Sequence, residues 1–264
     1  MSDGSPTTTA PRTVTATRYV TPLREGGSLP ALVEADDDGL YVLKFRGAGQ
    51  GPRALVAELV AGELGRALGL AVPEIVLIEL DAGLGRAEPD PEIQELIAAS
   101  GGRNVGLDFL PSALPFVPGD ASPPDPGLAA AIVWFDALMT NVDRTPRNPN
   151  LLWWHERLWL IDHGAALYLQ HGTGDLPAVA RRPFPLIREH VLLPYAGSIA
   201  AADARLAPLL TPALVEAIVS AVPGEWLADG EGEDAARRGY VEYLLRRLEA
   251  PREFAEEADA ARGR

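Results

Sequence analysis

The sequence contains no cysteine among its 264 residues. Disulfide frameworks and thiolate zinc sites are therefore excluded, and the absence fits a reducing compartment. No apolar run approaches the roughly 18 residues that a membrane-spanning helix needs. The N-terminus also lacks the basic-then-apolar pattern of a signal peptide. We therefore expect a cytoplasmic protein with no membrane partner.

Lysine is almost absent as well, since Lys44 is the only one in the chain and arginine supplies the other permanent positive charges. The formal net charge is −14, and no dense cluster of Lys and Arg interrupts the acidic composition. Binding to nucleic-acid backbones depends on such clusters. We therefore expect no direct nucleic-acid partner.

The chain divides by composition into five segments. Residues 1–16 are rich in Ser, Thr and Pro, which predicts a disordered tail. Residues 17–110 predict an antiparallel sheet with one main helix at 52–68 and a short helix at 91–100. The strands of this sheet are predicted near 18–20, 31–35, 40–45, 73–80 and 104–110. The proline-rich residues 111–127 predict a connector. Residues 128–250 predict a mostly helical part, with helical periods at 127–140, 207–222 and 235–249, and residues 251–264 predict a charged tail.

Two aspartates and an asparagine are the first candidates for a functional site. Asp143 and Asn148 lie in a polar loop, and Asp162 ends the apolar run Leu158–Ile161. Residues 151–161 predict a hairpin that turns at 155–157, which would bring Asp162 close to the other two. Carboxylate and amide oxygens in this number are typical of a site that holds magnesium on a nucleotide phosphate.

The single lysine is a candidate phosphate ligand. Lys44 ends a β-rich run that follows the glycine turn Gly26-Gly27-Ser28, whose backbone amides would cover a nucleotide. Two acids of the main helix are candidates to pair with it. Projection at about 100° per residue favours Glu63, which falls in the apolar arc, over Glu58, which does not.

Other catalytic motifs are missing. The chain has neither a Gly-Lys-Ser/Thr phosphate loop nor a Gly-x-Ser-x-Gly elbow. Its four histidines show no zinc-ligand spacing. His163 follows Asp162 directly, but a structural role is the better interpretation, as is core filling for the tryptophans of the hairpin.

The order of these motifs along the chain resembles that of the protein-kinase-like fold. The amino acids within the motifs resemble those of the HipA-like kinases. The resemblance covers about residues 17–170. The residues that carry it are Leu43-Lys44-Phe45, Glu58, Leu70-Ala71-Val72-Pro73, Asp108-Phe109-Leu110-Pro111, Asn141-Val142-Asp143-Arg144, Asn148 and Ile161-Asp162-His163-Gly164. It implies an α+β, two-lobed fold with a small antiparallel-sheet N-lobe and a mostly helical C-lobe.

The resemblance also implies a role for each candidate residue. By analogy, Lys44 binds the α- and β-phosphates of ATP, and Glu58, rather than Glu63, orients it. Asp143 is the catalytic base, and Asn148 and Asp162 hold Mg²⁺. The remaining nucleotide contacts are Phe109 and Leu110 at the adenine hinge and Gly26, Gly27 and Ser28 in the nucleotide loop, where related kinases can be self-modified.

The sequence departs from the motifs of eukaryotic protein kinases at positions that bear on the kind of substrate expected. Asn141 stands where eukaryotic protein kinases carry the histidine of the catalytic loop, and His163 replaces the phenylalanine of Asp-Phe-Gly. No activation segment ending in Ala-Pro-Glu is visible, so a eukaryotic-type peptide groove is not expected.

The sequence thus predicts an ATP- and Mg²⁺-dependent kinase that transfers the γ-phosphate to a hydroxyl, with protein serine or threonine as the family-typical acceptor. Two alternatives stay open: a small-molecule kinase of the aminoglycoside or lipid-kinase type, and a nucleotide-binding pseudokinase-like module without transfer. An antitoxin-like or regulatory protein partner is a further expectation from the family.

Overall fold

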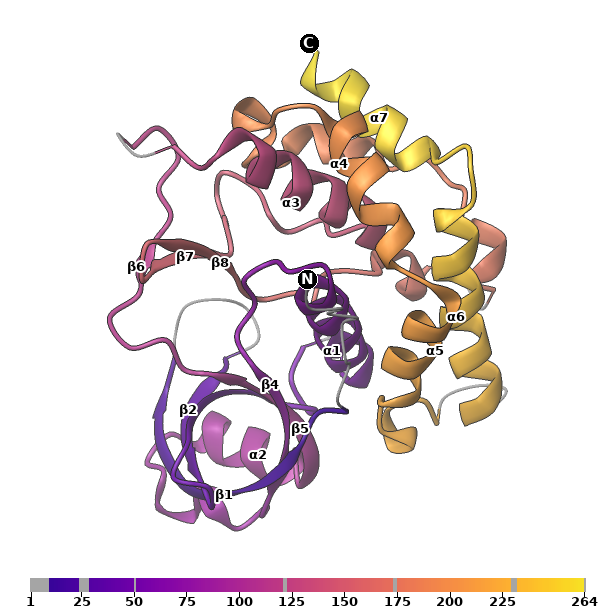
Figure 1. Ribbon diagram of the computed structural model, residues 1–264. Coiled ribbons are helices and arrows are strands. Elements are labelled where there is room, and N and C mark those ends of the chain that lie inside the picture. Colours follow the sequence, from indigo (N-terminus) through magenta and orange to yellow (C-terminus); the bar gives the residue numbers. More distant parts are fainter. Residues whose placement is uncertain are drawn as a thin grey trace, which may run out of the picture.

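The protein is described by a computed structural model over residues 10–23, 29–49, 51–120, 123–172, 175–228 and 232–263. It is a mixed α+β protein in which a sheet-based N-terminal part precedes a helical C-terminal part (Figure 1). Within the described ranges, no helix combines the length and apolar character needed to cross a membrane.

The N-terminal part is built on a closed five-stranded barrel. Its strands follow the order β1-β2-β3-β5-β4, with bounds Thr13–Pro22 (β1), Ala31–Ala35 (β2), Leu40–Lys44 (β3), Ile75–Leu80 (β4) and Gly102–Asp108 (β5). Four neighbouring pairs are antiparallel, and the pairing of β1 with β4 is parallel and closes the barrel. The predicted antiparallel sheet misses this closure, because a parallel pair joins strands distant in sequence and leaves no turn signature.

Two helices accompany the barrel. Helix α1 (Pro52–Ala67) begins with proline at its first turn and is buried on every side from Leu55 to Gly65. A Cβ at Gly62 would overlap the Ile75 side chain, so glycine permits α1 to pack closely against β4. Helix α2 (Pro91–Ala99) is capped by Asp90 and contributes Ile93 and Ile97 to the barrel core.

The C-terminal part packs around helix α3 (Pro126–Met139), whose residues from Ala129 onward are all buried. Helices α4 (Ile199–Leu206), α6 (Glu233–Leu248) and α7 (Glu253–Arg262) contact it, and α5 (Pro212–Ser220) packs against α6 and α1. A small sheet of β6 (Leu114–Pro115), β7 (Leu151–Trp154) and β8 (Arg157–Leu160) lies beside them. Short 3-10 helices lie between the elements of both parts, one in the N-terminal part at Leu84–Ala87 and the others in the C-terminal part at Tyr168–His171, Pro177–Val179, Pro185–Glu189, Leu193–Tyr195, Ala207–Leu209 and Gly224–Trp226.

Three sequence-based boundaries need correction. Strand β1 begins at Thr13, so the tail predicted for residues 1–16 extends too far. The single helix predicted over 207–222 is divided, because the ring of Pro212 can start a helix but cannot continue one. The predicted charged tail instead contains α7, whose Phe254, Ala255 and Ala258 are buried in the core.

Direct contacts join the two parts. The indole nitrogen of Trp226 donates to the carbonyl of Arg103 in β5 at 3.2 Å. The amide of Leu160 at the end of β8 donates to the carbonyl of Ala71 at 2.8 Å, which ties the hairpin to the segment between α1 and β4. One hydrogen bond therefore connects the hairpin to the N-terminal part, and another connects Trp226 to the barrel.

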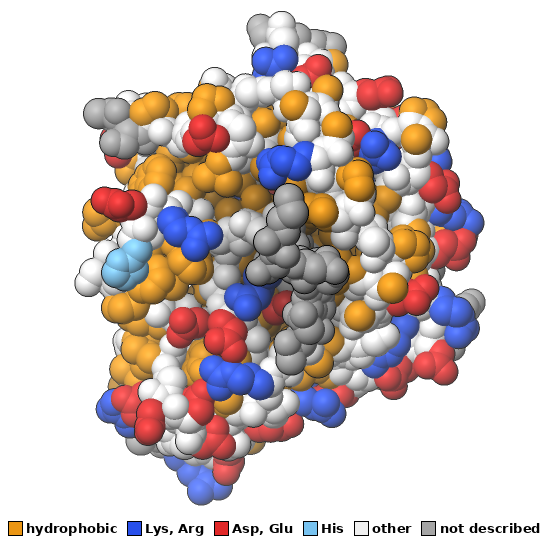
Figure 2. Space-filling model, in the orientation of Figure 1, with side chains coloured by type: hydrophobic (Ala, Val, Ile, Leu, Met, Phe, Trp, Pro, Cys, Tyr) orange, Lys and Arg blue, Asp and Glu red, His pale blue; other side chains and the backbone are white. Residues whose placement is uncertain are grey.

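An apolar surface lies on the small sheet. Figure 2 shows apolar side chains gathered on the left of the face in view, where Figure 1 places β6, β7 and β8. Leu114 is 67% exposed and Val117, three residues later, is 51% exposed. Large exposed apolar side chains grouped in this way are typical of contact surfaces.

Candidate active site

Lys44, the last residue of β3, lies in a cluster of carboxyl groups. Its Nζ is 2.8 Å from Asp162 Oδ1, and its side chain is only 11% exposed. Burial alone would lower the pKa of Lys44, but the charges of Asp162, Glu58 and Asp143 outweigh it and raise that pKa above its usual value. The ammonium group is therefore held charged among three acids from three different segments.

Glu58 reaches this cluster from the second turn of α1. It is 1% exposed, and its Oε1 accepts a hydrogen bond from the backbone amide of His163 at 3.0 Å. Burial raises its pKa, but Lys44 and His163 together outweigh burial and lower the pKa below its usual value. The buried carboxylate is thus close enough to be stabilised by the charge of Lys44, and it also anchors the segment that follows Asp162.

Glu63, the alternative favoured by helical projection, lies elsewhere. Its nearest cation is Arg66, with 3.6 Å between Nε and Oε1, and burial raises its pKa. The projection misleads because α1 is enclosed by protein on all sides, so its apolar arc does not mark the side that faces the site.

The loop after α3 supplies Asp143. Its Oδ2 accepts hydrogen bonds from Asn148 Nδ2 at 2.8 Å and Asn150 Nδ2 at 3.3 Å. Its backbone amide donates to Asn141 Oδ1 at 3.1 Å. Two carboxamides thus hold one oxygen of Asp143, while its Oδ1 has no hydrogen bond within the described part of the chain. This arrangement leaves Oδ1 available to accept a proton.

Asp162 follows β8 in the left-handed backbone region, with φ of 55°. The hairpin that leads to it turns at His155 and Glu156, both with positive φ, as a tight two-residue hairpin loop requires. A Cβ on Gly164 would lie 3.6 Å from Glu58 Oε2 and 3.7 Å from Asp162 Oδ1. A long side chain at this position would therefore enter the space beside both acids.

His163 takes no part in this cluster through hydrogen bonds of its ring. The ring is fully buried, and neither of its nitrogens makes a hydrogen bond within the described ranges, although Nδ1 is 3.5 Å from Glu58 Oε1. It packs edge-on against Phe135 of α3 at a centroid distance of 6.2 Å. These contacts favour a structural role.

The remaining predicted nucleotide contacts are less well placed or lie outside the structure. Gly26, Gly27 and Ser28 lie outside the described residues. Phe109 and Leu110 follow β5, which pairs with β3, but the amide of Phe109 already donates to Leu40 at 2.9 Å. Among the described residues the amide of Leu110 has no backbone partner, so Leu110 rather than Phe109 could donate to an adenine ring.

The oxygen-rich donor set fits magnesium. Asn148 donates through Nδ2 to Asp143, which leaves its amide oxygen for a cation. Magnesium is commonly bound by one or two protein oxygens together with substrate phosphates. The described residues contain no group of three or more His, Cys, Asp or Glu side chains that could hold a metal ion.

The sequence analysis assigned no role to three further residues: Asp136, Arg144 and His190. Asp136 and Arg144 have fully buried side chains that form an ion pair of 2.6 Å, and His190 Nε2 lies 2.8 Å from Asp136 Oδ2. The sequence did contain one signal, because Asp136 is a charged residue inside the apolar helix predicted at 127–140. A buried acid requires a partner, so a partner for Asp136 could have been expected.

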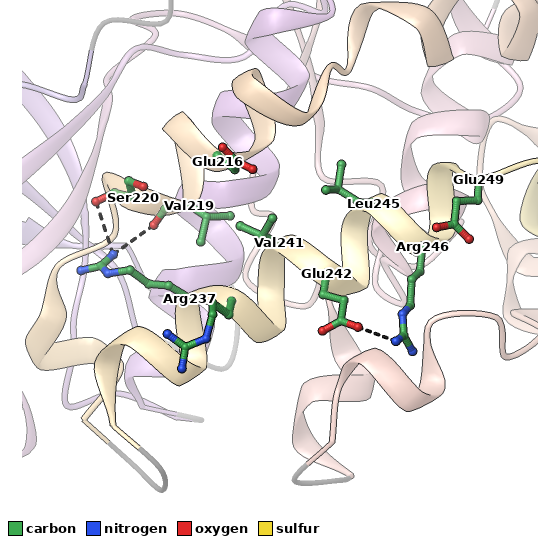
Figure 3. A pocket seen from close by; sticks show the side chains of 10 residues that line it. Glu216, Val219, Ser220, Arg237, Val241, Glu242, Leu245, Arg246 and Glu249 are labelled. Atoms are coloured by element: carbon green, nitrogen blue, oxygen red, sulfur yellow. Dashed lines mark hydrogen bonds and ion pairs between the residues drawn. The ribbon is translucent and has the colours of Figure 1, made fainter.

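A separate groove of about 770 Å³ lies between α5 and α6 (Figure 3). Val219, Val241 and Leu245 contribute apolar surface to it. Its charged side chains largely satisfy one another or the backbone: Arg246 pairs with Glu242, and Arg237 donates to the carbonyl of Val222 at 2.7 Å. None of the candidate site residues lines this groove, which is thus distinct from the cluster around Lys44.

Comparison with known proteins agrees with this geometry. The family model of the HipA-like kinases matches residues 17–179, more than half of the chain. The chain therefore belongs to the HipA-like kinases and is a kinase, which confirms the resemblance inferred from sequence. No curated protein matches it.

Two solved structures are similar in fold. One is the Helicobacter pylori proinflammatory kinase CtkA, with a TM-score of 0.54 and 14% identity over 95% of this chain and 98% of that one. The other is a Golgi casein kinase, with a TM-score of 0.49 and 13% identity over 95% of this chain and 72% of that one. The first likeness supports a kinase fold at low sequence identity.

Proposed function

We propose that this kinase transfers the γ-phosphate of Mg-ATP to a hydroxyl group, with a two-lobed arrangement in which the barrel and α1 hold the nucleotide. The single observation that carries the proposal is the environment of Lys44, whose ammonium lies among Asp162, Glu58 and Asp143. Three carboxyl groups around one ammonium leave an excess of negative charge that favours a divalent cation.

Each residue has a distinct task in this proposal. Lys44 binds phosphate oxygens, and Glu58 holds Lys44 in place through its buried carboxylate. Asn148 and Asp162 hold Mg²⁺, which when bound neutralises charge on the phosphates. Asp143 accepts the proton of the acceptor hydroxyl at Oδ1 while its Oδ2 stays bonded to Asn148 and Asn150. Transfer forms the new oxygen–phosphorus bond, breaks the one to the β-phosphate and releases ADP.

The surface beside the site favours a protein as acceptor. Leu114 of β6 pairs with Trp153 of β7, the strand that starts directly after Asn150. The exposed side chains of Leu114 and Val117 offer apolar contact to a polypeptide. A small polar substrate would not need such a surface. We therefore propose serine or threonine in a protein as the acceptor.

Nucleotide-dependent unfolding tests the proposal. At about 100 times its dissociation constant, Mg-ATP should stabilise the wild-type protein by roughly 2.7 kcal/mol, a shift of a few degrees. Asp162→Ala should abolish the magnesium-dependent part of the shift. Asp143→Asn should keep the shift but lose ADP release from Mg-ATP, because it retains the shape of the base but not its proton affinity. A wild-type protein without any shift would overturn the proposal.

A further inference from the structure

The residues Asp136, Arg144 and His190 form a buried cluster that includes the residue after Asp143 and contacts the loop that carries it. We propose that His190 is a positioning residue of the phosphotransfer site, acting through Asp136 and Arg144 to set the positions of Asp143, Asn148 and Asp162. This inference rests on the proposed function, since it concerns the same site.

Arg144 is the member that reaches the site. It follows Asp143 directly, and its Nη1 donates to the carbonyl of Ile161 at 3.3 Å and also to the carbonyl of Asn150. Ile161 directly precedes Asp162, and Asn150 comes two residues after Asn148. One guanidinium group therefore connects the three chain segments that carry the candidate base and the two candidate metal ligands.

Asp136 fixes the orientation of that guanidinium group. Its Oδ2 accepts from Arg144 Nε at 2.6 Å, and its Oδ1 accepts from Asn141 Nδ2 at 3.0 Å. Burial raises its pKa, but Arg144 and His190 outweigh burial and hold the pKa well below its usual range. Asp136 lies on the buried helix α3, so the loop is bonded to an element of the core.

His190 completes the cluster as a neutral donor. Its Nδ1 accepts the amide hydrogen of Leu192 at 3.0 Å, so the ring proton is on Nε2, which donates to Asp136 Oδ2 at 2.8 Å. Burial lowers the pKa of His190 even though Asp136 opposes this, which favours the neutral ring. The neighbouring residue Val191 also donates its amide to the carbonyl of Arg144 at 3.0 Å.

The cluster is more than an ordinary buried ion pair. Buried ion pairs are often no more stabilising than apolar replacements, so stability alone does not account for this cluster. Here both oxygens of the Asp136 side chain accept from the loop, through Asn141 and Arg144, and His190 donates to one of them. Misplacing reacting groups by about 1 Å costs on the order of 100-fold in rate, so a small shift of Arg144 would be measurable.

The test compares His190→Leu, His190→Gln and the control Trp134→Phe. Trp134 is a buried residue on α3, two positions before Asp136, and its indole donates to Asp203 at 2.8 Å, away from the loop. Both His190→Leu and Trp134→Phe remove one buried donor to a carboxylate. Gln at position 190 places an amide donor near the site of Nε2, so it should recover most of the loss.

We expect His190→Leu to lower kcat for ADP release by about 10- to 100-fold with little change in the KM for ATP. Hydrogen exchange of the protein without metal or nucleotide should also accelerate at residues 144–150 and 161–164. Trp134→Phe should change neither quantity. Equal kcat and exchange in His190→Leu and Trp134→Phe would overturn the inference while the proposed function stands. A wild-type protein that neither binds Mg-ATP nor releases ADP would overturn both.

Discussion

Lys44 and Asp162 are joined by an ion pair of 2.8 Å, although one ends a strand of the barrel and the other follows the hairpin of the helical part. The pair links the two parts of the molecule at the candidate active site. If Asp162 holds Mg²⁺ when nucleotide binds, Lys44 must exchange this carboxylate for phosphate oxygens. The same two residues thus contribute to stability without ligand and to binding with it.

We expect Lys44→Met to lower the free energy of unfolding by about 1–3 kcal/mol, because it leaves Glu58 and Asp162 without their cation. The loss should be below that of a fully buried pair, since the Asp162 side chain is 36% exposed. Urea denaturation of Lys44→Met, Asp162→Asn and the double variant measures the coupling. The control Arg103→Met breaks two partly exposed pairs, with Glu225 and Glu79, and should cost less than about 1 kcal/mol. Additive single losses at Lys44 and Asp162 would contradict the coupling.

The buried acids predict a loss of stability in acid. Charge partners lower the pKa of Glu58 and of Asp136 in the folded protein below their usual values of 4.5 and 3.8. The unfolded chain therefore binds more protons than the folded one as the pH falls through these values, so the stabilisation present at neutral pH is lost below about pH 4.5. Asp136→Asn should be less stable at pH 7 and should show a shallower decline between pH 5 and pH 3. Parallel urea-midpoint curves for the two proteins would refute this assignment.

The sequence was sufficient for the types and order of the candidate residues. Lys44, Asp143, Asn148 and Asp162 stand out because each is a polar residue beside an apolar run or within a tight turn, and the structure brings them together. The hairpin of β7 and β8 was also predictable, since short-range turn chemistry determines it. The functional roles of these residues stay predictions.

Features that depend on distant packing were not predictable. The parallel closure of β1 on β4 has no local signal. Helical projection favoured Glu63, whereas the family resemblance favoured Glu58. Projection could not decide between them, because α1 has no solvent-facing side from Leu55 to Gly65. His190 lies 54 positions from Asp136, so nothing in its own neighbourhood in the sequence marks it as a partner.

Helix α7 packs into the core although its many charged residues predicted an unpacked tail. Its Phe254 is 5% exposed, lies 5.5 Å from the Trp134 ring between centroids, and also stacks with the guanidinium of Arg247. We expect Phe254→Ala to lower the free energy of unfolding by about 3–5 kcal/mol, as for other buried aromatic truncations. Glu256→Ala, on the exposed side of the same helix, should change it by less than about 0.5 kcal/mol. Equal unfolding midpoints for the two variants would show that α7 is not part of the folded core.

Glu58 and Glu63 provide a matched pair on one helix, because both lie in its buried stretch and, of the two, Glu58 is the one whose charge raises the pKa of Lys44. Glu58→Gln should lower kcat/KM for ATP by about 10- to 100-fold, since an amide no longer fixes the ammonium group. Glu63→Gln should leave kcat/KM unchanged and raise the free energy of unfolding at pH 7 by about 0.5 kcal/mol. The reason is that burial raises the pKa of Glu63, so the ionised carboxylate is disfavoured in the folded state. The gain in the free energy of unfolding should vanish once the pH falls below 4.5, the usual pKa of glutamate, because Glu63 is then protonated in both states. Steady-state kinetics and urea unfolding measure both effects, and a loss of activity confined to Glu63→Gln would reverse the assignment of the two acids.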